Sequence, residues 1–164
     1  LDNKFNPKIS NFLIAAQFLQ NNQIITLNDV AGTARYMSPQ ILENEPYSGE
    51  KADIFSLGMI LFNIVTGKFG IKSSSPDTDP YYMHIKLENF NEYWASLPVE
   101  ITNINYSDEF KDLYIKMICY NENNRPNIAQ ILNHHWFDEI SNLDNEQLNQ
   151  LELDVRNDFL SRLN

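Results

Sequence analysis

Histidine and cysteine, which ligate transition metals and act as nucleophiles, are scarce in this chain. It contains three histidines, His84, His134 and His135, and one cysteine, Cys119. No histidine lies beside carboxylates at the spacing of a metal-ligand set, so we expect core or surface histidines and no metal site. Cys119 follows the apolar face of an expected helix over residues 110–118, which favours a buried, inert thiol. A single cysteine also excludes an intramolecular disulfide framework and a cysteine-based zinc site.

The chain is strongly acidic. Its 12 Lys and Arg residues against 22 Asp and Glu residues give a formal net charge of −10, which argues against binding to nucleic acid through the phosphate backbone. Over 164 residues, a hydrophobic content of 43% and a charged content of 21% are those of one globular domain. The chain begins at Leu1 and no targeting segment follows, so we expect a piece of a longer polypeptide. The compartment stays open, and the cytoplasm is compatible with the sequence.

The elements that must position any site are mostly helical, and residues 49–67 are the most informative of them. Apolar side chains point in every direction around a 3.6-residue period there, which is typical of a helix buried in a core or a membrane. Interruptions such as Ser56 and Asn63 leave the run short of a membrane span of about 20 residues. We therefore expect a buried central helix, about 25 Å long. Ser48 is the expected N-cap and Gly67 the stop.

Cap and turn signals predict further helices around the central one. Asp79 followed by Pro80 opens a helix over residues 81–87, and residues 91–97 form a second short helix. A third helix is capped by Ser107. Its expected inward-facing side chains are Phe110, Leu113, Tyr114, Met117 and Ile118.

The remaining elements lie near the two ends of the chain. Asn127 opens a helix whose expected inward-facing side chains are Ile128, Ile131 and Leu132. Asp144 and Gln147 resemble a capping box for a last helix. Its apolar stripe is Leu148, Leu151, Val155 and Phe159. Only residues 8–10, from Lys8 to Ser10, are expected to form a strand, so the fold class is mainly α in one domain.

Three segments together resemble the C-terminal lobe of a eukaryotic protein kinase. GTARYMSPQ at residues 32–40 resembles the end of an activation segment, G-T-x-x-Y-[ML]-A-P-E. DIFSLG at residues 53–58 resembles D-[VI]-W-S-L-G, the start of the family's central helix. RP at residues 125–126 with ILNHHWF at residues 131–137 resembles R-P-x-x-x-x-[IL]-L-x-H-P-[WF]. The segments occur in the family's order and at family-like separations.

The opening residues extend the resemblance. LDNKFNPKISNFL at residues 1–13 is similar to L-D-x-x-F-x-x-K-I-x-D-F-G, so the catalytic loop H-R-D-x-x-x-x-N and the glycine-rich loop would lie upstream. The family uses ATP and Mg²⁺; without those parts we expect neither cofactor, and no phosphoryl transfer, from this chain alone. The expected partners are a protein substrate or other protein partner and the missing N-terminal half of the domain. The resemblance implies a partial kinase domain over residues 1–137.

Residues 138–164 lie beyond the resemblance and are expected to form an acidic, amphipathic helical tail. Seven acidic and two basic residues give this tail a net charge of −5. Its apolar stripe can dock back on the lobe or bind another protein, and the sequence does not choose between these.

Two positions depart from the family pattern beside the nucleotide. Asn11 stands where the family has the Asp that holds Mg²⁺, and an amide oxygen supplies a dipole in place of a full charge. Leu13 stands where the family has Gly; it cannot adopt Gly-only backbone conformations and adds bulk. Three interpretations are open: drift in a non-functional copy or a sequence error, loss or weakening of activity even in a longer parent, and catalysis retained by compensation.

Gln40 replaces the Glu that pairs with Arg125 in the family. Removing the carboxylate partner of a buried Arg costs about 3–5 kcal/mol where nothing compensates. The Gln amide still accepts hydrogen bonds, so we expect a weakened link between the two residues. The alternative is that Arg125 reaches solvent or Glu122.

The resemblance also implies roles in the activation segment. Thr33 matches the Thr with which serine/threonine kinases bind the catalytic Asp and Lys; outside this motif it would be a turn residue. Tyr36 and Met37 are expected beside the substrate's hydroxyl-bearing segment. Asp29 lies where many family members carry an activating phosphothreonine, and Thr26 is the nearest phosphorylatable alternative. The plainer interpretation of both is a solvated loop residue.

In the family, the residue at Asp53 anchors the backbone of the catalytic loop. That loop is absent from this sequence, so we expect Asp53 to face an empty site or solvent, beside uncovered apolar surface of the central helix. Our first hypothesis is a fragment of a serine/threonine protein kinase-like domain, inactive as this chain alone. The family reaction is ATP-dependent phosphorylation of protein Ser or Thr. The alternative is a non-catalytic, pseudokinase-type protein-binding module.

Overall fold

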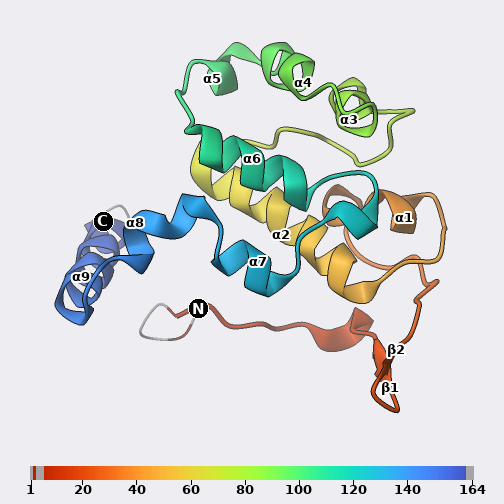
Figure 1. The fold of residues 1–164 in the computed structure, drawn as a ribbon, viewed down its shortest axis with the longest axis horizontal. Coiled ribbons are helices and arrows are strands. Elements are labelled where there is room, and N and C mark those ends of the chain that lie inside the picture. The colour runs from red at the N-terminus through yellow and green to blue at the C-terminus, as the bar shows by residue number, and fades with distance from the viewer. Residues whose placement is uncertain (1, 3–5, 162–164) are drawn as a thin grey trace.

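The computed structural model of the chain describes residues 2 and 6–161 (Figure 1). Residues 1 and 3–5 of the opening motif, and the side chain of Phe159 in the expected last helix, lie outside the described residues. The chain is mainly helical, as expected. Its α-helices are α1 (Pro39–Leu42), α2 (Gly49–Thr66), α3 (Pro80–Lys86), α4 (Phe90–Ser96), α5 (Val99–Thr102), α6 (Asp108–Met117), α7 (Ile128–Leu132), α8 (Asp138–Ser141) and α9 (Asn145–Ser161). The 3-10 helices are η1 (Phe12–Ile14), η2 (Ala34–Tyr36), η3 (Glu122–Asn124) and η4 (His135–Phe137), and the strands are β1 (Leu19–Gln20) and β2 (Gln23–Ile24).

Helix α2 is the central element, and its two ends are those predicted. The Ser48 Oγ accepts a hydrogen bond from the Lys51 backbone N–H at 3.5 Å, which satisfies an otherwise unpaired donor of the first turn. Gly67 ends the helix in the left-handed conformation, with φ of 67°. One side of α2 is buried, including Phe55, Met59 and Phe62. The opposite side is not, which is described with the candidate site below.

Helix α6 packs along the buried side of α2 (Figure 1). It begins as predicted, because the Ser107 Oγ accepts from the Phe110 N–H at 3.2 Å. All five side chains predicted to face inward are no more than 3% exposed. The two helices approach closely at Gly58, where an added Cβ would lie 2.8 Å from Ile118 Cγ2 and 3.0 Å from Met117 Cβ. Glycine is therefore required there by packing.

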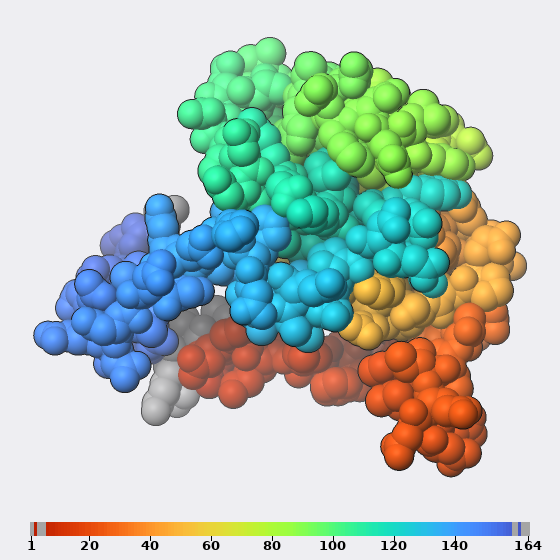
Figure 2. All heavy atoms as spheres, in the orientation of Figure 1, coloured from red at the N-terminus to blue at the C-terminus, as the bar shows by residue number. Residues whose placement is uncertain are grey.

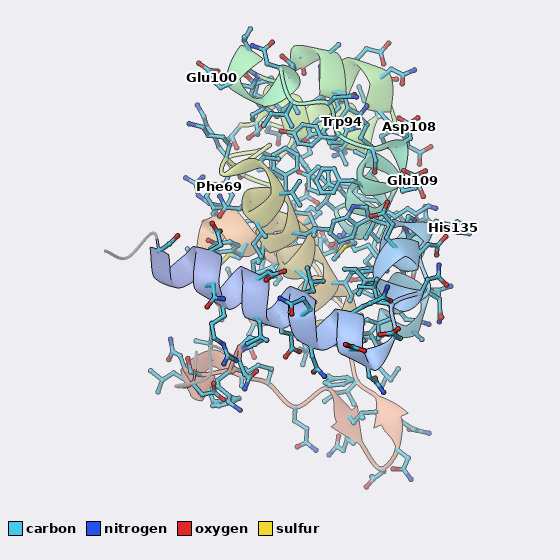
Figure 3. The ribbon with its side chains drawn as sticks, turned by 90° about the vertical axis from the view of Figure 1, so that its left-hand side faces the viewer. Phe69, Trp94, Glu100, Asp108, Glu109 and His135 are labelled. Atoms are coloured by element: carbon cyan, nitrogen blue, oxygen red, sulfur yellow. The ribbon has the colours of Figure 1, made fainter. Side chains whose placement is uncertain are left out.

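An aromatic cluster joins α2, α4 and α6. The Phe62 ring lies 4.5 Å from the Tyr114 ring and 6.0 Å from the Trp94 ring, centroid to centroid. The Tyr93 and Tyr114 hydroxyls share a buried hydrogen bond of 3.0 Å. Figure 3 shows Trp94 directed into this cluster, whereas Glu100 lies on the outer helix α5. Burial of several large rings in one place supplies much of the apolar driving force of the fold.

Asp79 fixes the segment before α3. It is 2% exposed, and its carboxylate accepts the backbone N–H groups of Tyr81 and Tyr82 in the first turn of α3. The same carboxylate accepts the N–H groups of Lys72 and Ser73 at 2.6 and 3.1 Å. The expected cap is thus present, and the helices begin within one residue of their predicted starts at 81 and 91.

Helix α7 corrects one prediction. Its capping box between Asn127 and Gln130 is complete, and Ile131 is buried at 6% exposure. Ile128 and Leu132, which we expected to face inward, are 52% and 62% exposed. A helix of five residues has room for one buried position against α6, so its flanking apolar residues stay at the surface.

The predicted strand over Lys8–Ser10 is wrong, since those residues are irregular. The described strands instead form an antiparallel hairpin that pairs Leu19 with Ile24 and Gln20 with Gln23. Its two-residue turn is Asn21-Asn22, with φ of 51° and 61°. Asn tolerates this left-handed conformation, which two-residue hairpin turns need. Figure 2 shows the hairpin projecting from the helical body.

The tail is helical, and α9 begins with the expected capping box between Asp144 and Gln147. Of its apolar stripe, Leu151 is 41% and Val155 62% exposed. Helices α8 and α9 lie to one side of the helical body (Figures 1 and 2). Among the described helices, none combines the length and apolarity needed to cross a membrane.

Candidate functional site

Asn11, at the family's metal-binding position, is exposed at the start of η1. Its backbone is left-handed, with φ of 62° and ψ of 63°, and its side chain makes no capping hydrogen bond. Leu13 lies within η1, is 93% exposed and is not among the described residues with positive φ. In this segment the left-handed backbone conformation that favours glycine therefore occurs at Asn11, and Asn tolerates this conformation.

The described residues do not fit a magnesium site. Within residues 2 and 6–161, no group of three or more His, Cys, Asp and Glu side chains could hold a metal ion. Asn11 offers one neutral amide oxygen, whereas a hard cation is bound by several oxygens, usually including carboxylates. His134 and His135 are each held by one carboxylate, through Asp112 and Asp138, at 2.9 Å. His135 points away from the body of the protein (Figure 3). We assign no step to a bound metal.

Hydrogen bonds to backbone carbonyls hold the segment that carries Thr33, Tyr36 and Met37 in place. The Tyr36 carbonyl accepts from Ser56 Oγ at 2.7 Å, and the Met37 carbonyl accepts from Ser74 Oγ at 2.6 Å. Tyr36 and Met37 are half-buried, whereas Thr33 is exposed and its side chain makes no capping bond to η2.

A second contact holds the same segment through side chains. The Tyr36 ring lies edge-on to the Phe69 ring at 6.0 Å, and the Arg35 guanidinium lies 4.4 Å from the centroid of the same ring. Sequence reasoning missed the anchors Ser56 and Ser74. Ser56 is part of the DIFSLG motif, but we interpreted it only as an interruption of the apolar run.

Thr26 and Asp29 are both exposed. The Asp29 backbone carbonyl accepts the Tyr47 hydroxyl at 3.0 Å, and Leu27 pairs with Tyr47 in an isolated antiparallel bridge. Partial burial, with smaller contributions from Asp29 and Asp53, raises the pKa of Tyr47. The backbone around the two candidates is thus held near the start of α2, while their side chains face solvent.

Gln40 and Arg125 meet in the interior, 85 positions apart in the chain. Arg125 is 1% exposed, so it does not reach solvent. Its Nη2–H donates to Gln40 Oε1 at 2.8 Å, and the Gln40 Nε2–H donates to the Tyr120 carbonyl at 2.7 Å. Glu122, the other expected partner, accepts the Ser48 N–H instead, at 3.1 Å.

Backbone carbonyls complete the coordination of Arg125. Its Nε–H donates to Cys119 O at 2.9 Å, Nη1–H to Lys51 O at 3.0 Å and Nη2–H also to Tyr120 O at 3.2 Å. Burial lowers the pKa of this guanidinium. A buried cation held by neutral oxygens ties α1, α2 and the η3 region together without a carboxylate on the guanidinium.

Asp53 and an apolar stripe form the exposed side of α2. Asp53 is exposed, although partial burial of its carboxyl group raises its pKa. Leu57, Ile60 and Ile64 follow at helical spacing and are 44%, 43% and 75% exposed. We call these four residues the α2 stripe. The central helix therefore carries apolar side chains on an exposed face as well as on its buried face.

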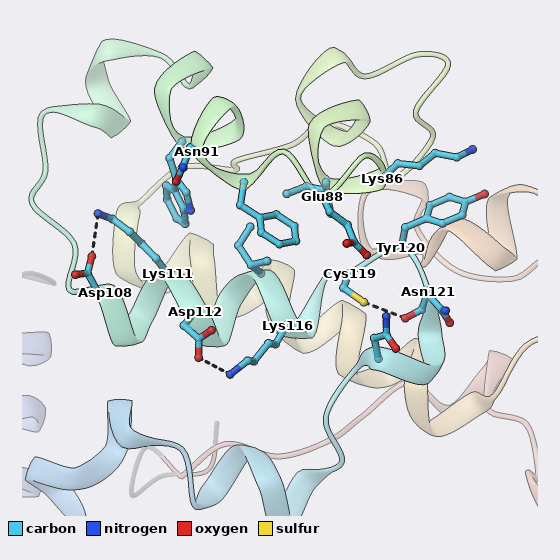
Figure 4. A pocket seen from close by; sticks show the side chains of 15 residues that line it. Lys86, Glu88, Asn91, Asp108, Lys111, Asp112, Lys116, Cys119, Tyr120 and Asn121 are labelled. Carbon is cyan, nitrogen blue, oxygen red and sulfur yellow. Dashed lines mark hydrogen bonds and ion pairs between the residues drawn. The ribbon is translucent and has the colours of Figure 1, made fainter.

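A cavity of about 490 Å³ lies between α6 and the α3–α4 region (Figure 4). Ile85, Phe90, Trp94 and Ile115 supply apolar lining, and the ion pairs Lys111–Asp108 and Lys116–Asp112 border it. Sequence reasoning missed this cavity, because its walls come from several helices whose packing no local pattern records.

Cys119 lies at one end of this cavity and is half-buried, not buried as expected. Its Sγ–H donates to the Asn121 carbonyl at 2.9 Å (Figure 4). Burial raises the pKa of the thiol, which disfavours the reactive thiolate.

Comparison with known proteins identifies relatives with kinase names. The serine/threonine-protein kinase ppk6 of Schizosaccharomyces pombe is 31% identical over 117 residues, which cover 71% of this chain and 13% of that protein. The G-type lectin S-receptor-like serine/threonine-protein kinase SD1-13 of Arabidopsis thaliana is 32% identical over 139 residues, covering 80% of this chain and 16% of that protein. The testis-specific serine/threonine-protein kinase 1 of Mus musculus is 30% identical over 138 residues, covering 83% and 35%.

The chain thus spans a small part of the length of these relatives. A family model described as the protein kinase domain matches residues 1–137, the same span that carries the sequence motifs. With the helical lobe built around α2, this match shows that the chain belongs to the protein kinase domain family.

Proposed function

We propose that residues 1–137 act as the activation segment and substrate-side lobe of a serine/threonine protein kinase. The observation that carries the proposal is that two hydrogen bonds hold residues 32–40 to the lobe, one from Ser56 of α2 to the Tyr36 carbonyl and one from Arg125, just after η3, to Gln40. A surface that positions a peptide must be rigid, because catalysis of phosphoryl transfer is mostly positioning and electrostatics. Thr33, Tyr36 and Met37 lie on this fastened segment as the substrate-facing residues.

Under the same proposal, the chain alone does not catalyse phosphoryl transfer. The sequence of residues 1–164 contains no H-R-D-x-x-x-x-N segment, and Asn11 supplies no charge for a metal ion. The α2 stripe, headed by Asp53, is the surface on which a segment with the catalytic loop would pack. Its apolar residues are exposed and lie on one helix face, as such a contact requires.

A chimera tests this function. The N-terminal lobe and catalytic loop of an active serine/threonine kinase are joined before residue 1, and phosphorylation of peptide libraries is measured with Asn11 and with Asn11→Asp. We expect transfer to Ser and Thr, not Tyr, raised at least about tenfold by Asn11→Asp, because a carboxylate restores charge at the metal. Thr33→Ala should lower it, and Thr102→Ala, an exposed Thr on α5 outside the activation segment, serves as the matched control. A folded Asn11→Asp chimera that transfers nothing, or that prefers Tyr, would contradict the proposal.

A second candidate function is a non-catalytic protein-binding module. The α2 stripe favours it, because the same exposed face can receive a partner protein that performs no chemistry. Folding of the isolated chain discriminates between the two functions. A self-sufficient module unfolds cooperatively in urea and stays monomeric, whereas a lobe that needs its other half self-associates through the stripe. In the second case, Leu57→Lys with Ile60→Lys should reduce that self-association.

A further inference from the structure

A second cavity, of about 390 Å³, lies between the start of α2, α6 and α7, and we call it the α6–α7 cleft. Its ionisable lining residues are Lys51, Lys116, Arg125 and His134, and no Asp or Glu is among the described residues that line it. The chain as a whole carries a formal charge of −10. The cleft thus gathers three cations in an acidic molecule, with the Asp112 carboxylate at its border, in contact with Lys116 and His134.

The two lysines keep unused donors. Lys51 Nζ donates to the Arg125 carbonyl at 2.6 Å, and Lys116 Nζ donates to Asp112 Oδ2 at 2.5 Å, the second of which Figure 4 draws. An ammonium group has three N–H donors, so each lysine retains two after these bonds. Arg125 directs four of its five N–H donors to interior oxygens, and its main contribution to the cleft is its charge.

His134 is occupied elsewhere. Its Nδ1 accepts the Trp136 backbone N–H at 3.2 Å, so the ring proton lies on Nε2, which contacts Asp112 Oδ2 at 2.9 Å. Asp112 is thereby shared between His134 and Lys116. Glu122, the other carboxylate beside these cations, accepts the Ser48 N–H at 3.1 Å. Both carboxylates are engaged, and three cations against two carboxylates leave the site positive.

Three amides add neutral donors to the same cleft. Gln130 Oε1 accepts the Asn127 N–H at 2.9 Å, which fixes the orientation of the amide and leaves its NH₂ group as the free end. Asn123 and Asn124 also line the cleft, and their side-chain amides make no hydrogen bond to any described residue. These N–H groups have no acceptor partner among the described residues and lie close to positive charge. Such a site suits an anion that only accepts hydrogen bonds.

We propose that the α6–α7 cleft binds the dianion of a phosphate monoester, with Lys51, Lys116 and the Gln130 amide as its donors. A phosphate monoester carries close to two negative charges at neutral pH and offers three strong acceptor oxygens, which matches two ammonium groups and neighbouring amides. The cavity volume lies in the usual range of ligand sites, about 300–1,000 Å³. Arg125 lines the cleft and also holds Gln40, but the three proposed donors, Lys51, Lys116 and Gln130, lie outside the activation segment, so the phosphate site does not depend on the proposed kinase function.

Gln130→Glu is the sharpest test. A glutamate keeps the acceptor for the Asn127 N–H, so the capping box of α7 survives, but it places a negative charge where the free NH₂ group was. Gln147→Glu is the matched control, because Gln147 occupies the same capping-box position of α9, outside the cleft. Lys116→Gln, with exposed Lys68→Gln as its control, provides a second pair if Gln130→Glu does not fold.

Binding is measured on the full chain by calorimetry and by amide chemical shifts, at about pH 7.5 and 5.5. The probes are inorganic phosphate and a phosphoserine peptide, with the unphosphorylated peptide for comparison. We expect saturable binding of the phosphorylated probe that weakens at the lower pH, where the second phosphate proton, with a pKa of about 6, is retained. Gln130→Glu should weaken it at least about tenfold and Gln147→Glu less than about twofold.

The two probes distinguish the source of the phosphate. Equal affinity for inorganic phosphate and phosphopeptide identifies a small-anion site, whereas tighter binding of the phosphopeptide identifies a protein-borne phosphate; both support the site. Absence of saturable binding, equal losses in Gln130→Glu and Gln147→Glu, or equal affinity for the unphosphorylated peptide overturns it.

Discussion

Replacing Gln40 with Met measures how much the hydrogen bonds of the Gln40 side chain contribute to the stability of the contact between the activation segment and the lobe. Met has a similar volume and can fill the same space, so the substitution removes polar atoms with little change in packing. Two hydrogen bonds disappear: the one that Gln40 Oε1 accepts from Arg125 at 2.8 Å, and the one that its Nε2–H donates to the Tyr120 carbonyl at 2.7 Å.

The magnitude follows from the charge and burial of Arg125. A hydrogen bond to a charged group contributes about 1.5–3 kcal/mol, and a neutral one about 0.5–1.5 kcal/mol. Arg125 is 1% exposed, so water does not replace the lost acceptor, but three backbone carbonyls still accept from it. We therefore expect the free energy of unfolding to fall by about 2–3 kcal/mol, toward the lower part of the summed range.

Urea denaturation of both chains, followed by circular dichroism, gives this difference if the slope with denaturant is unchanged. Gln150→Met is the matched control, because Gln150 is exposed on α9 and its side chain donates to exposed Asp154; it should change stability by less than about 0.5 kcal/mol. Gln40→Glu retains an acceptor for Arg125 and should lose less than Gln40→Met. A loss below about 0.5 kcal/mol for Gln40→Met would refute the reasoning, since Arg125 would then not depend on this bond.

Three further predictions concern packing and burial. Gly58→Ala gains about 1 kcal/mol of helix propensity but forces a Cβ to 2.8 Å from Ile118 Cγ2, and such overpacking costs about 1–3 kcal/mol. Urea titration should therefore show a net loss of folding stability, whereas a stabilised variant would contradict the close packing at Gly58. Burial raises the pKa of Cys119, so iodoacetamide at about pH 7.5 should alkylate it at least about tenfold more slowly in the folded than in the urea-unfolded chain; equal rates would disprove this. Burial also raises the pKa values of Tyr93 and Tyr114. The folded state is therefore stabilised while both hydroxyls keep their protons. This contribution is complete below the unfolded pKa of about 10 and is lost as pH rises through the folded pKa values. Melting temperature should therefore fall above about pH 10, less steeply in Tyr114→Phe, and an identical slope in that variant would count against the buried pair.

The elements that were predicted well are those specified by local patterns. Helix α2 combines an apolar run with Ser48 and Gly67 at its ends, and α6 combines a Ser107 cap with an apolar face, so periodicity and capping sufficed. The prediction failed where tertiary packing decides. Ile128 and Leu132 are apolar at helical spacing, but α7 is too short to bury them.

The N-terminal region shows a different failure. A strand at Lys8–Ser10 needs a partner strand, and no apolar pattern of three residues can specify one. The hairpin had a local signal, the Asn21-Asn22 pair, which sequence reasoning did not use. Paired residues that tolerate positive φ between two short apolar segments are a turn signal of their own.

The candidate site was predictable only as far as its motifs. Motif order linked Gln40 to Arg125 across the chain, and the structure places them in contact. Ser74, the second anchor of the activation segment, belongs to a serine-rich connector that has no motif, and neither cavity has a signature in the sequence. Contacts between segments that are distant in sequence need either a family pattern or the three-dimensional structure.

Phosphoryl transfer by the purified chain alone tests the central claim most directly. The chain is incubated with γ-labelled ATP, Mg²⁺ and a Ser/Thr peptide library, and product is quantified by mass spectrometry beside an active serine/threonine kinase. Because Asn11 offers no charged metal ligand and no H-R-D-x-x-x-x-N segment lies in residues 1–164, we predict no transfer above the reaction without protein. Transfer that follows this chain through purification and disappears in Thr33→Ala would contradict the account.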